Sequence, residues 1–112
     1  MPQPNADTVG AFYASYLAQD RAAAERLVAE EFVFTSPRDD HIDRAAFFGR
    51  CFPTADRFKE YELLSVVPAG DDDVFVLYEY KLDDGQRYRN AEVITVRDGK
   101  VAESQVFFGG RF

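Results

Sequence analysis

The chain has 112 residues, 46% of them hydrophobic, so it can bury one sizeable core without a metal or a disulfide. Its formal net charge of −7 argues against a nucleic-acid partner or an anionic membrane surface, which would both repel it. A single cysteine excludes an internal disulfide, and we find neither a long apolar span nor a signal peptide. We therefore expect one domain, residues 1–112, in the cytoplasm.

The first part of the chain has helical periodicity. Asn5 or Asp7 can cap a first helix, whose apolar positions recur at helical spacing: Val9, Phe12, Tyr13, Tyr16 and Leu17. Asp20 can cap a second, short helix that runs to about Ala29. These two segments predict a pair of neighbouring helices with a strongly aromatic face.

A short strand and a third helix are expected next. Phe32–Ser36 has strand composition, and Pro37 stops it. Arg38–His41 is polar and is predicted to be a loop. Asp43 can cap the third helix, which Phe52-Pro53 ends.

From about Arg57 onward the pattern changes to strict alternation. Asp98-Gly99 lies between two such runs, which is the strongest short-range signal for a hairpin. Short turns make neighbouring strands antiparallel. The sequence therefore predicts an α+β fold, with three N-terminal helices on one face of a curved, mainly antiparallel sheet whose strands lie near 58–68, 74–82, 87–97 and 100–108.

One row of the strand near 87–97 is unusual, because it places polar side chains beside apolar ones: Tyr88, Asn90, Glu92, Ile94 and Val96. A carboxylate that faces a core is costly unless it has a partner. We predict that this row forms the floor of a pocket. A bulge would shift the alternation by one residue and bring Arg89 or Ala91 to the position of Glu92.

The order of these elements resembles the NTF2-like superfamily, in particular its SnoaL-like branch with the ketosteroid-isomerase-like fold. The resemblance rests on four motifs: Phe34-Thr35-Ser36-Pro37, Ile42-Asp43-Arg44, Arg89-Asn90-Ala91-Glu92-Val93 and Asp98-Gly99-Lys100. It implies a cone-shaped α+β barrel around one hydrophobic pocket, and a homodimer that forms through the outer face of the sheet. Because members of the superfamily differ in function, the fold does not identify a reaction.

The chain departs from two catalytic patterns of that superfamily. The isomerase-like members place an aspartate before the proline that follows the first strand, and this chain has Ser36 there. The tyrosine that supplies their oxyanion donor falls on Phe12, or within one turn of Tyr13 or Tyr16. The Asp-Arg-Asp arrangement of epoxide-hydrolase-like members is incomplete. Steroid-type isomerisation is therefore not expected.

Two residues are candidates for acid–base chemistry, His41 and Glu92. His41 lies in a polar cluster with Asp39, Asp40 and Asp43, which is also typical of an ordinary loop. Glu92 could equally form a structural ion pair with Arg89, Arg87 or Arg44. The candidate ligand-binding residues are Tyr13, Tyr16, Phe34, Phe48, Tyr78 and Asn90.

Two functions are consistent with this sequence. The first is a pocket for a small apolar, cyclic or polycyclic molecule, with cofactor-independent proton transfer of the isomerase, cyclase or hydratase type. The second is a non-catalytic module that binds a ligand or another protein. No motif for a dinucleotide, a phosphate loop or zinc occurs, so we expect neither a cofactor nor a metal.

Overall fold

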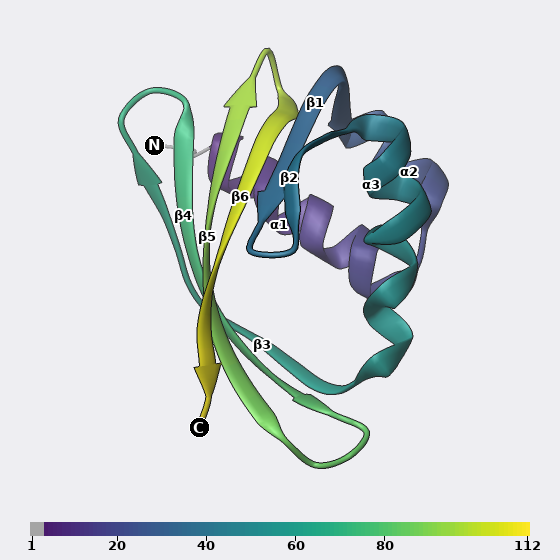
Figure 1. Ribbon diagram of the computed structural model, residues 1–112. Helices are drawn as coiled ribbons and strands as arrows, with labels where there is room; N and C mark the ends of the chain where they lie inside the picture. Colours follow the sequence, from purple (N-terminus) through teal and green to yellow (C-terminus); the bar gives the residue numbers. More distant parts are fainter. Residues whose placement is uncertain (1–3) are drawn as a thin grey trace.

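A computed structural model describes residues 4–112, which form helices on one side of a curved sheet (Figure 1). The helices are α1 (Pro4–Ala18), α2 (Arg21–Leu27) and α3 (Arg44–Arg50), and a 3-10 helix, η1 (Phe52–Arg57), follows α3. The strands are β1 (Val28–Ser36), β2 (Asp39–Asp43), β3 (Phe58–Ala69), β4 (Asp73–Leu82), β5 (Arg87–Arg97) and β6 (Lys100–Arg111). The predicted α+β class is confirmed.

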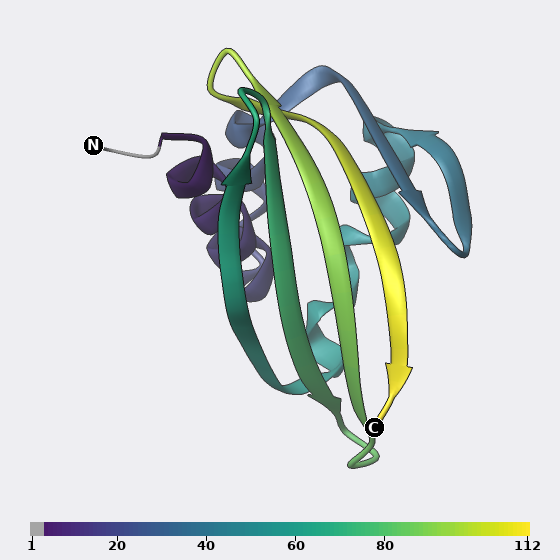
Figure 2. The ribbon, with the colours of Figure 1, turned by 90° about the vertical axis from the view of Figure 1, so that its left-hand side faces the viewer.

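The six strands form one sheet in the order β2-β1-β6-β5-β4-β3. Strands β3 to β6 are the predicted antiparallel meander, whereas β1 pairs with β6 in parallel. Viewed from the outer face, the long strands lie in front of the helices (Figure 2). All three α-helices therefore cover the inner, concave face, and the outer face has no helix over it.

Several predicted boundaries differ from the structure. The segment 39–43, predicted to lie in a loop and a helix cap, is the edge strand β2, joined to β1 by a two-residue turn. Its polar composition is typical of an exposed edge and hid its pairing. The third helix therefore follows a hairpin in the chain, although it contacts the first two: the Phe47 ring meets Phe12 of α1, and Arg44 donates to the carbonyl of Glu25 in α2. Asn5 and Asp7 lie inside α1, which already begins at Pro4, so neither is its cap.

Other local predictions are confirmed. The side chains of Asp20 and Asp43 accept hydrogen bonds from the backbone amides of Ala23 and Ala46, as caps of α2 and α3. Asp98 and Gly99 both have positive φ, 53° and 75°, which the tight turn between β5 and β6 requires. Helix α2 ends at Leu27, because the following residues already belong to β1.

The core lies between the inner face of the sheet and the helices. Its fully buried members include Ile94 and Val96 of β5, with neighbours from other elements: Val9, Val28, Phe32, Phe48, Val74, Val76 and Val101. In the described part of the chain no helix is long and apolar enough to cross a membrane. The core fills only part of the inner face, and the rest lines a cavity.

Candidate functional site

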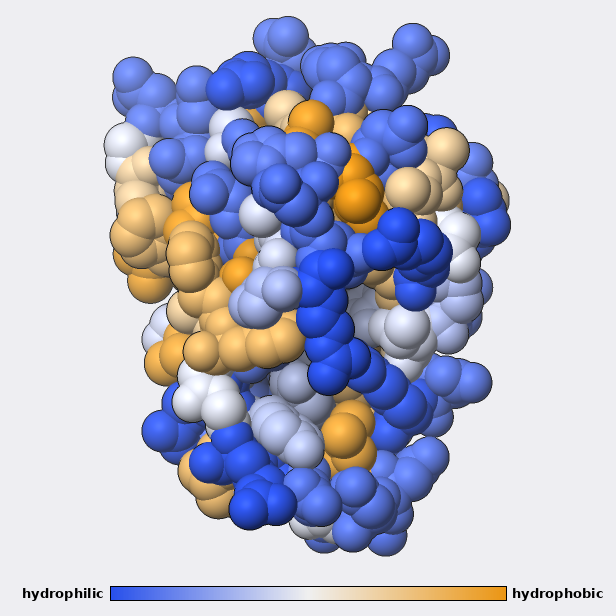
Figure 3. All heavy atoms as spheres, in the orientation of Figure 1, coloured by the Kyte–Doolittle hydropathy of each residue, from blue (hydrophilic) through white to orange (hydrophobic). Residues whose placement is uncertain are grey.

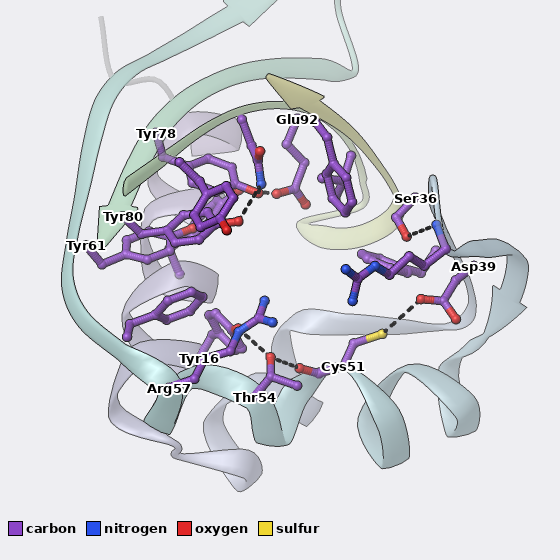
Figure 4. A pocket seen from close by; sticks show the side chains of 18 of the residues that line it. Tyr16, Ser36, Asp39, Cys51, Thr54, Arg57, Tyr61, Tyr78, Tyr80 and Glu92 are labelled. Atoms are coloured by element: carbon purple, nitrogen blue, oxygen red, sulfur yellow. Dashed lines mark hydrogen bonds between the residues drawn. The ribbon is translucent and has the colours of Figure 1, made fainter. Parts of the chain in front are cut away.

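A cavity of about 410 Å³ lies between the inner face of the sheet, α1 and the α3–η1 segment (Figure 4). Its wall is largely aromatic, with polar groups at particular positions. The lining residues are Phe12, Tyr13, Tyr16, Phe34, Ser36, Arg38, Asp39, Phe47, Arg50, Cys51, Thr54, Arg57, Phe58, Tyr61, Tyr78, Tyr80, Leu82, Tyr88, Asn90, Glu92, Val106, Phe108 and Gly110. This size and lining are typical of a site for a small molecule.

Glu92 lies at the buried end of this cavity, with 6% of its surface exposed. β5 pairs with β4 without any bulge, and Glu92 is opposite Val76, so the predicted alternation places its side chain inward. The hydroxyl of Tyr13 donates a hydrogen bond to one carboxyl oxygen, and the hydroxyl of Ser104 donates to the other. The predicted inward row of β5 is therefore confirmed.

Glu92 has no arginine partner among the residues that the structure describes. Arg89 contacts the carboxylate of Glu79, and Arg87 contacts that of Glu60. Arg44 donates to the backbone carbonyl of Glu25. The carboxyl group of Glu92 thus lies among hydroxyl groups, and none of the three arginines forms the ion pair that the sequence left open.

Burial raises the pKa of Glu92, because the ionised form loses its hydration. The hydroxyls of Ser104, Tyr13 and Tyr78 offset part of this rise, since they favour the carboxylate. Burial, followed by the charge of Glu92, raises the pKa of Tyr13 as well. Tyr13 therefore remains a hydrogen-bond donor, and Glu92 can exist as a neutral acid at a pH where an exposed glutamate would be ionised.

A group of near-parallel tyrosine rings forms one side of the cavity. Tyr61, Tyr80 and Tyr88 are successive cross-strand partners on β3, β4 and β5. The Tyr61 and Tyr80 rings are 6.1 Å apart at an interplanar angle of 11°, and the Tyr80 and Tyr88 rings are 5.5 Å apart at 22°. Tyr78 stacks on Tyr61 at 5.2 Å. Figure 4 shows Tyr61, Tyr78 and Tyr80 together on one side, so a flat ring could stack on them.

The hydroxyl groups on this side differ in their partners. The side-chain amide of Asn90 donates weakly to Tyr78 and Tyr80, at 3.4 and 3.5 Å. Burial raises the pKa of Tyr61 and of Tyr78 above the usual range. Among the described residues, the Tyr61 hydroxyl has no hydrogen-bond partner, so it is available to a ligand.

Ser36, Asp39 and Cys51 lie across the cavity from these tyrosines (Figure 4). Asp39 contacts the Arg50 guanidinium, and the Cys51 thiol lies 3.8 Å from its other carboxyl oxygen. Burial, then Asp39, raises the pKa of Cys51 to about 11. The Cys51 thiol is therefore protonated near neutral pH. The Tyr16 and Thr54 hydroxyls are 2.8 Å apart.

The structure brings most of the predicted site residues together. Those that line the cavity are Glu92, Tyr13, Tyr16, Phe34, Tyr78 and Asn90. Phe48 does not line it, and its ring packs in the core against Phe47 and Phe52. His41 also lies outside the wall, and its Nδ1 is 2.6 Å from the exposed carboxylate of Asp40. Whether any of these residues acts on a ligand remains a prediction.

The polar cluster of β2 is engaged in local contacts. Asp39 contacts Arg50, Asp40 contacts His41, and Asp43 caps α3. Within residues 4–112 no three histidine, cysteine, aspartate or glutamate side chains are grouped so that they could hold a metal ion. Each member of this cluster thus has a structural contact.

Sequence reasoning missed Ser104 as a partner of Glu92. A bulge in β6, between the pairs Val96–Val101 and Thr95–Glu103, brings Ser104 opposite Ile94 and onto the inner face, and regular pairing from the turn would have placed Ser104 outward. It also missed the lining arginines, Arg38, Arg50 and Arg57, which come from three separate segments. No periodic pattern in the sequence signals that these side chains converge.

Comparisons with known proteins agree with this architecture. The solved structures that resemble the chain include a protein from Kribbella flavida, with a TM-score of 0.82 and 22% identity over 91% of this chain and 84% of that one. Bal32a, from a soil-derived mobile gene cassette, has a TM-score of 0.80 and 21% identity, covering 95% and 89%. AclR, a candidate hydroxylase from Streptomyces galilaeus, has a TM-score of 0.73 and 18% identity, covering 94% and 88%.

At these identities the structural likeness establishes the fold alone. A search of curated proteins found no significant match. The profile of the SnoaL-like domain, by contrast, matches residues 9–104, which is most of the chain. The chain therefore belongs to the SnoaL-like domain family of NTF2-like proteins.

Proposed function

We propose that the cavity binds a small cyclic or polycyclic molecule and that Glu92 exchanges a proton with it, without a cofactor. The observation that supports this proposal is the buried carboxyl group of Glu92, which lies in the cavity wall between the hydroxyls of Tyr13 and Ser104. A carboxyl group whose pKa is raised by burial can both accept a proton and return it. The reaction class is isomerisation, cyclisation or hydration.

The proposed proton transfer needs two kinds of group. The ionised form of Glu92 removes a proton from a carbon next to a carbonyl, and the neutral form returns it to another atom of the same molecule. The negative charge that develops on the carbonyl oxygen needs a donor, and the partnerless hydroxyl of Tyr61 can supply one. Tyr13 is a positioning residue, since its hydroxyl holds the carboxyl group of Glu92.

His41 has no part in this proposal. Its side chain is 69% exposed and bonded to Asp40, and it is absent from the cavity wall. Glu92 and tyrosine hydroxyls alone are therefore assigned the proton transfer.

The test is hydrogen exchange on a cyclic ketone such as tetralone, followed by NMR in D₂O. Wild-type protein is expected to accelerate loss of the proton signal next to the carbonyl, and Glu92→Gln to reduce that acceleration by about 100-fold or more. Glu103→Gln, on the neighbouring strand β6 and outside the cavity wall, is the matched control and should exchange normally. Unchanged exchange in Glu92→Gln would refute the catalytic proposal.

Binding is measured separately, by thermal shift and native mass spectrometry with cyclic ketones, lactones and polyketide-like compounds. Binding without exchange would favour the non-catalytic ligand-binding function. Absence of both, for every compound, would refute the cavity as a ligand site.

A second copy of the chain is the partner that we propose for the outer face of the sheet. Exposed apolar residues are neighbours there by register: Val67 pairs with Phe75, and Ala91 of β5 links Leu77 to Phe107. Hydrophobic residues gather at the left-hand edge of Figure 3, on the side of the sheet. Monomeric proteins rarely expose large contiguous apolar patches, which supports a homodimer.

Sedimentation velocity tests this proposal. Phe107→Asp is expected to convert a dimer to a monomer, because it places a charge within the outer apolar patch. Leu17→Asp adds the same charge to an exposed position on α1 and should leave the dimer intact. A wild-type chain that sediments as a monomer at high concentration would rule the homodimer out.

A further inference from the structure

The two ends of the cavity have opposite chemical character. The buried end holds the carboxyl group of Glu92 among hydroxyls, whereas exposed arginines lie at the solvent end. Arg38 follows β1, Arg50 ends α3 and Arg57 ends η1, so three separate segments bring a guanidinium to the same opening. A single carboxylate at that end, Asp39, contacts one of them, Arg50.

The guanidinium groups of the other two arginines, Arg38 and Arg57, have no carboxylate partner among the residues described. Arg57 is on the cavity side, because it lines the wall with Tyr16 and Cys51 and its positive charge offsets part of the rise in pKa that burial causes in both. Its guanidinium carbon is 5.1 Å from the centroid of the Phe58 ring, another lining residue. Figure 4 places Arg57 beside Tyr16 and Thr54. Arg38 lines the same cavity, and its backbone amide donates a hydrogen bond to the side-chain hydroxyl of Ser36.

This local charge is opposite to that of the whole chain. The protein has a formal net charge of −7, yet its cavity opening has three arginines and one aspartate. Three arginines on the sheet, Arg87, Arg89 and Arg97, each contact a carboxylate. Two unpaired guanidiniums at one opening therefore point to a negatively charged group on the ligand.

We infer that the ligand of this cavity is a cyclic molecule with a carboxylate, which Arg57 and Arg38 bind at the opening while the ring lies against the tyrosines. Guanidinium groups match a planar carboxylate and can bind it through two parallel hydrogen bonds. The carboxylate stays near solvent, so little of its hydration is lost. The ring then extends toward Glu92, where an anion would be disfavoured by that carboxyl group. This inference rests on the proposed function and names the substrate class of the same cavity.

Two probes with the same ring test it, naphthoate and naphthamide, with binding followed by isothermal titration calorimetry at neutral pH. Wild-type protein is expected to bind naphthoate about tenfold more tightly than naphthamide, because charge-assisted hydrogen bonds exceed neutral ones. Arg57→Gln and Arg38→Gln should each reduce naphthoate affinity toward that of naphthamide and leave naphthamide affinity unchanged. Naphthyl phosphate, measured in parallel, distinguishes a carboxylate site from a phosphate site.

The matched control is Arg26→Gln, which removes one positive charge from the exposed end of α2 and should change neither affinity. Melting temperatures of the variants establish that each is folded. Equal affinity of wild-type protein for the two probes, or tighter binding of naphthyl phosphate than of naphthoate, would overturn the inference but leave the proposed proton transfer in place. Failure of both naphthalene probes to bind would count against the ring-binding cavity itself, and the inference would fall with it.

Discussion

The two halves of β5 differ although they belong to one continuous strand. Near the Asp98-Gly99 turn, Ile94 and Val96 are fully buried in a packed core. Toward the other end of the strand, Asn90 and Glu92 are also buried, but their side chains line the cavity. Burial alone therefore does not distinguish a core residue from a residue of the site. What differs is whether the helices fill the space opposite the strand.

The largest expected effect contrasts valine truncations in the two regions, the packed core and the cavity wall. Val96→Ala removes two methyl groups from a closely packed site and should lower the free energy of unfolding by about 2 kcal/mol. Val106→Ala makes the same change on β6 at a partly buried position that lines the cavity, and should cost less than about 1 kcal/mol. Urea denaturation measures both. Equal losses would mean that the cavity is closed in solution.

The next prediction uses pH to separate the halves. The folded-state pKa of Glu92 is raised above its ordinary value of 4.5, so the folded protein binds this proton more tightly than the unfolded chain does. Glu92 therefore stabilises the fold below pH 4.5, and this contribution is lost as the pH rises through the folded pKa. The slope is at most about 1.4 kcal/mol per pH unit.

Glu92→Gln cannot titrate and supplies the reference for this measurement. We expect the difference in unfolding free energy, wild type minus Glu92→Gln, to decrease with rising pH above 4.5 and then to level off. A difference that increases over the same range would mean that the folded pKa is lowered, as in an ion pair.

A smaller effect is expected from Tyr13→Phe. The Tyr13 hydroxyl favours ionised Glu92, so its removal should raise the pKa of Glu92 further, by up to about one pH unit. The carboxyl carbon-13 signal of Glu92 measures this shift directly by NMR. Tyr16→Phe is the control, because the Tyr16 hydroxyl bonds with Thr54 and should leave the titration midpoint in place. A midpoint that moves equally in both variants would indicate a general loosening of the cavity.

The smallest effect on stability is expected from Tyr61→Phe. The Tyr61 hydroxyl has no partner in the described chain, and its ring contacts with Tyr78 and Tyr80 persist in the variant. Unfolding free energy should change by less than about 0.5 kcal/mol. Tetralone affinity, in contrast, should fall, because its carbonyl loses a donor. A large loss of stability with unchanged affinity would assign this hydroxyl to the structure.

Much of the architecture could be predicted because it depends on local rules. Alternation located the four long strands, Asp98-Gly99 located the turn between β5 and β6, and the unbroken alternation of β5 directs Glu92 inward. The edge strand β2 was missed, because its exposed residues show no apolar alternation to detect. Its position next to β1, and the parallel pairing of β1 with β6, arise from contacts between segments far apart in the chain.

The sequence by itself thus determined that a carboxyl group and an amide would face inward from β5, since side chains alternate along any strand. Tertiary structure alone decided what meets them. Tyr13, which binds Glu92, is 79 residues away on α1, and the arginines at the opening come from three separate segments. Such convergence depends on how the helices pack on the curved sheet, and no spacing within the chain records it. The same packing leaves a cavity in front of Glu92 and a filled core in front of Ile94.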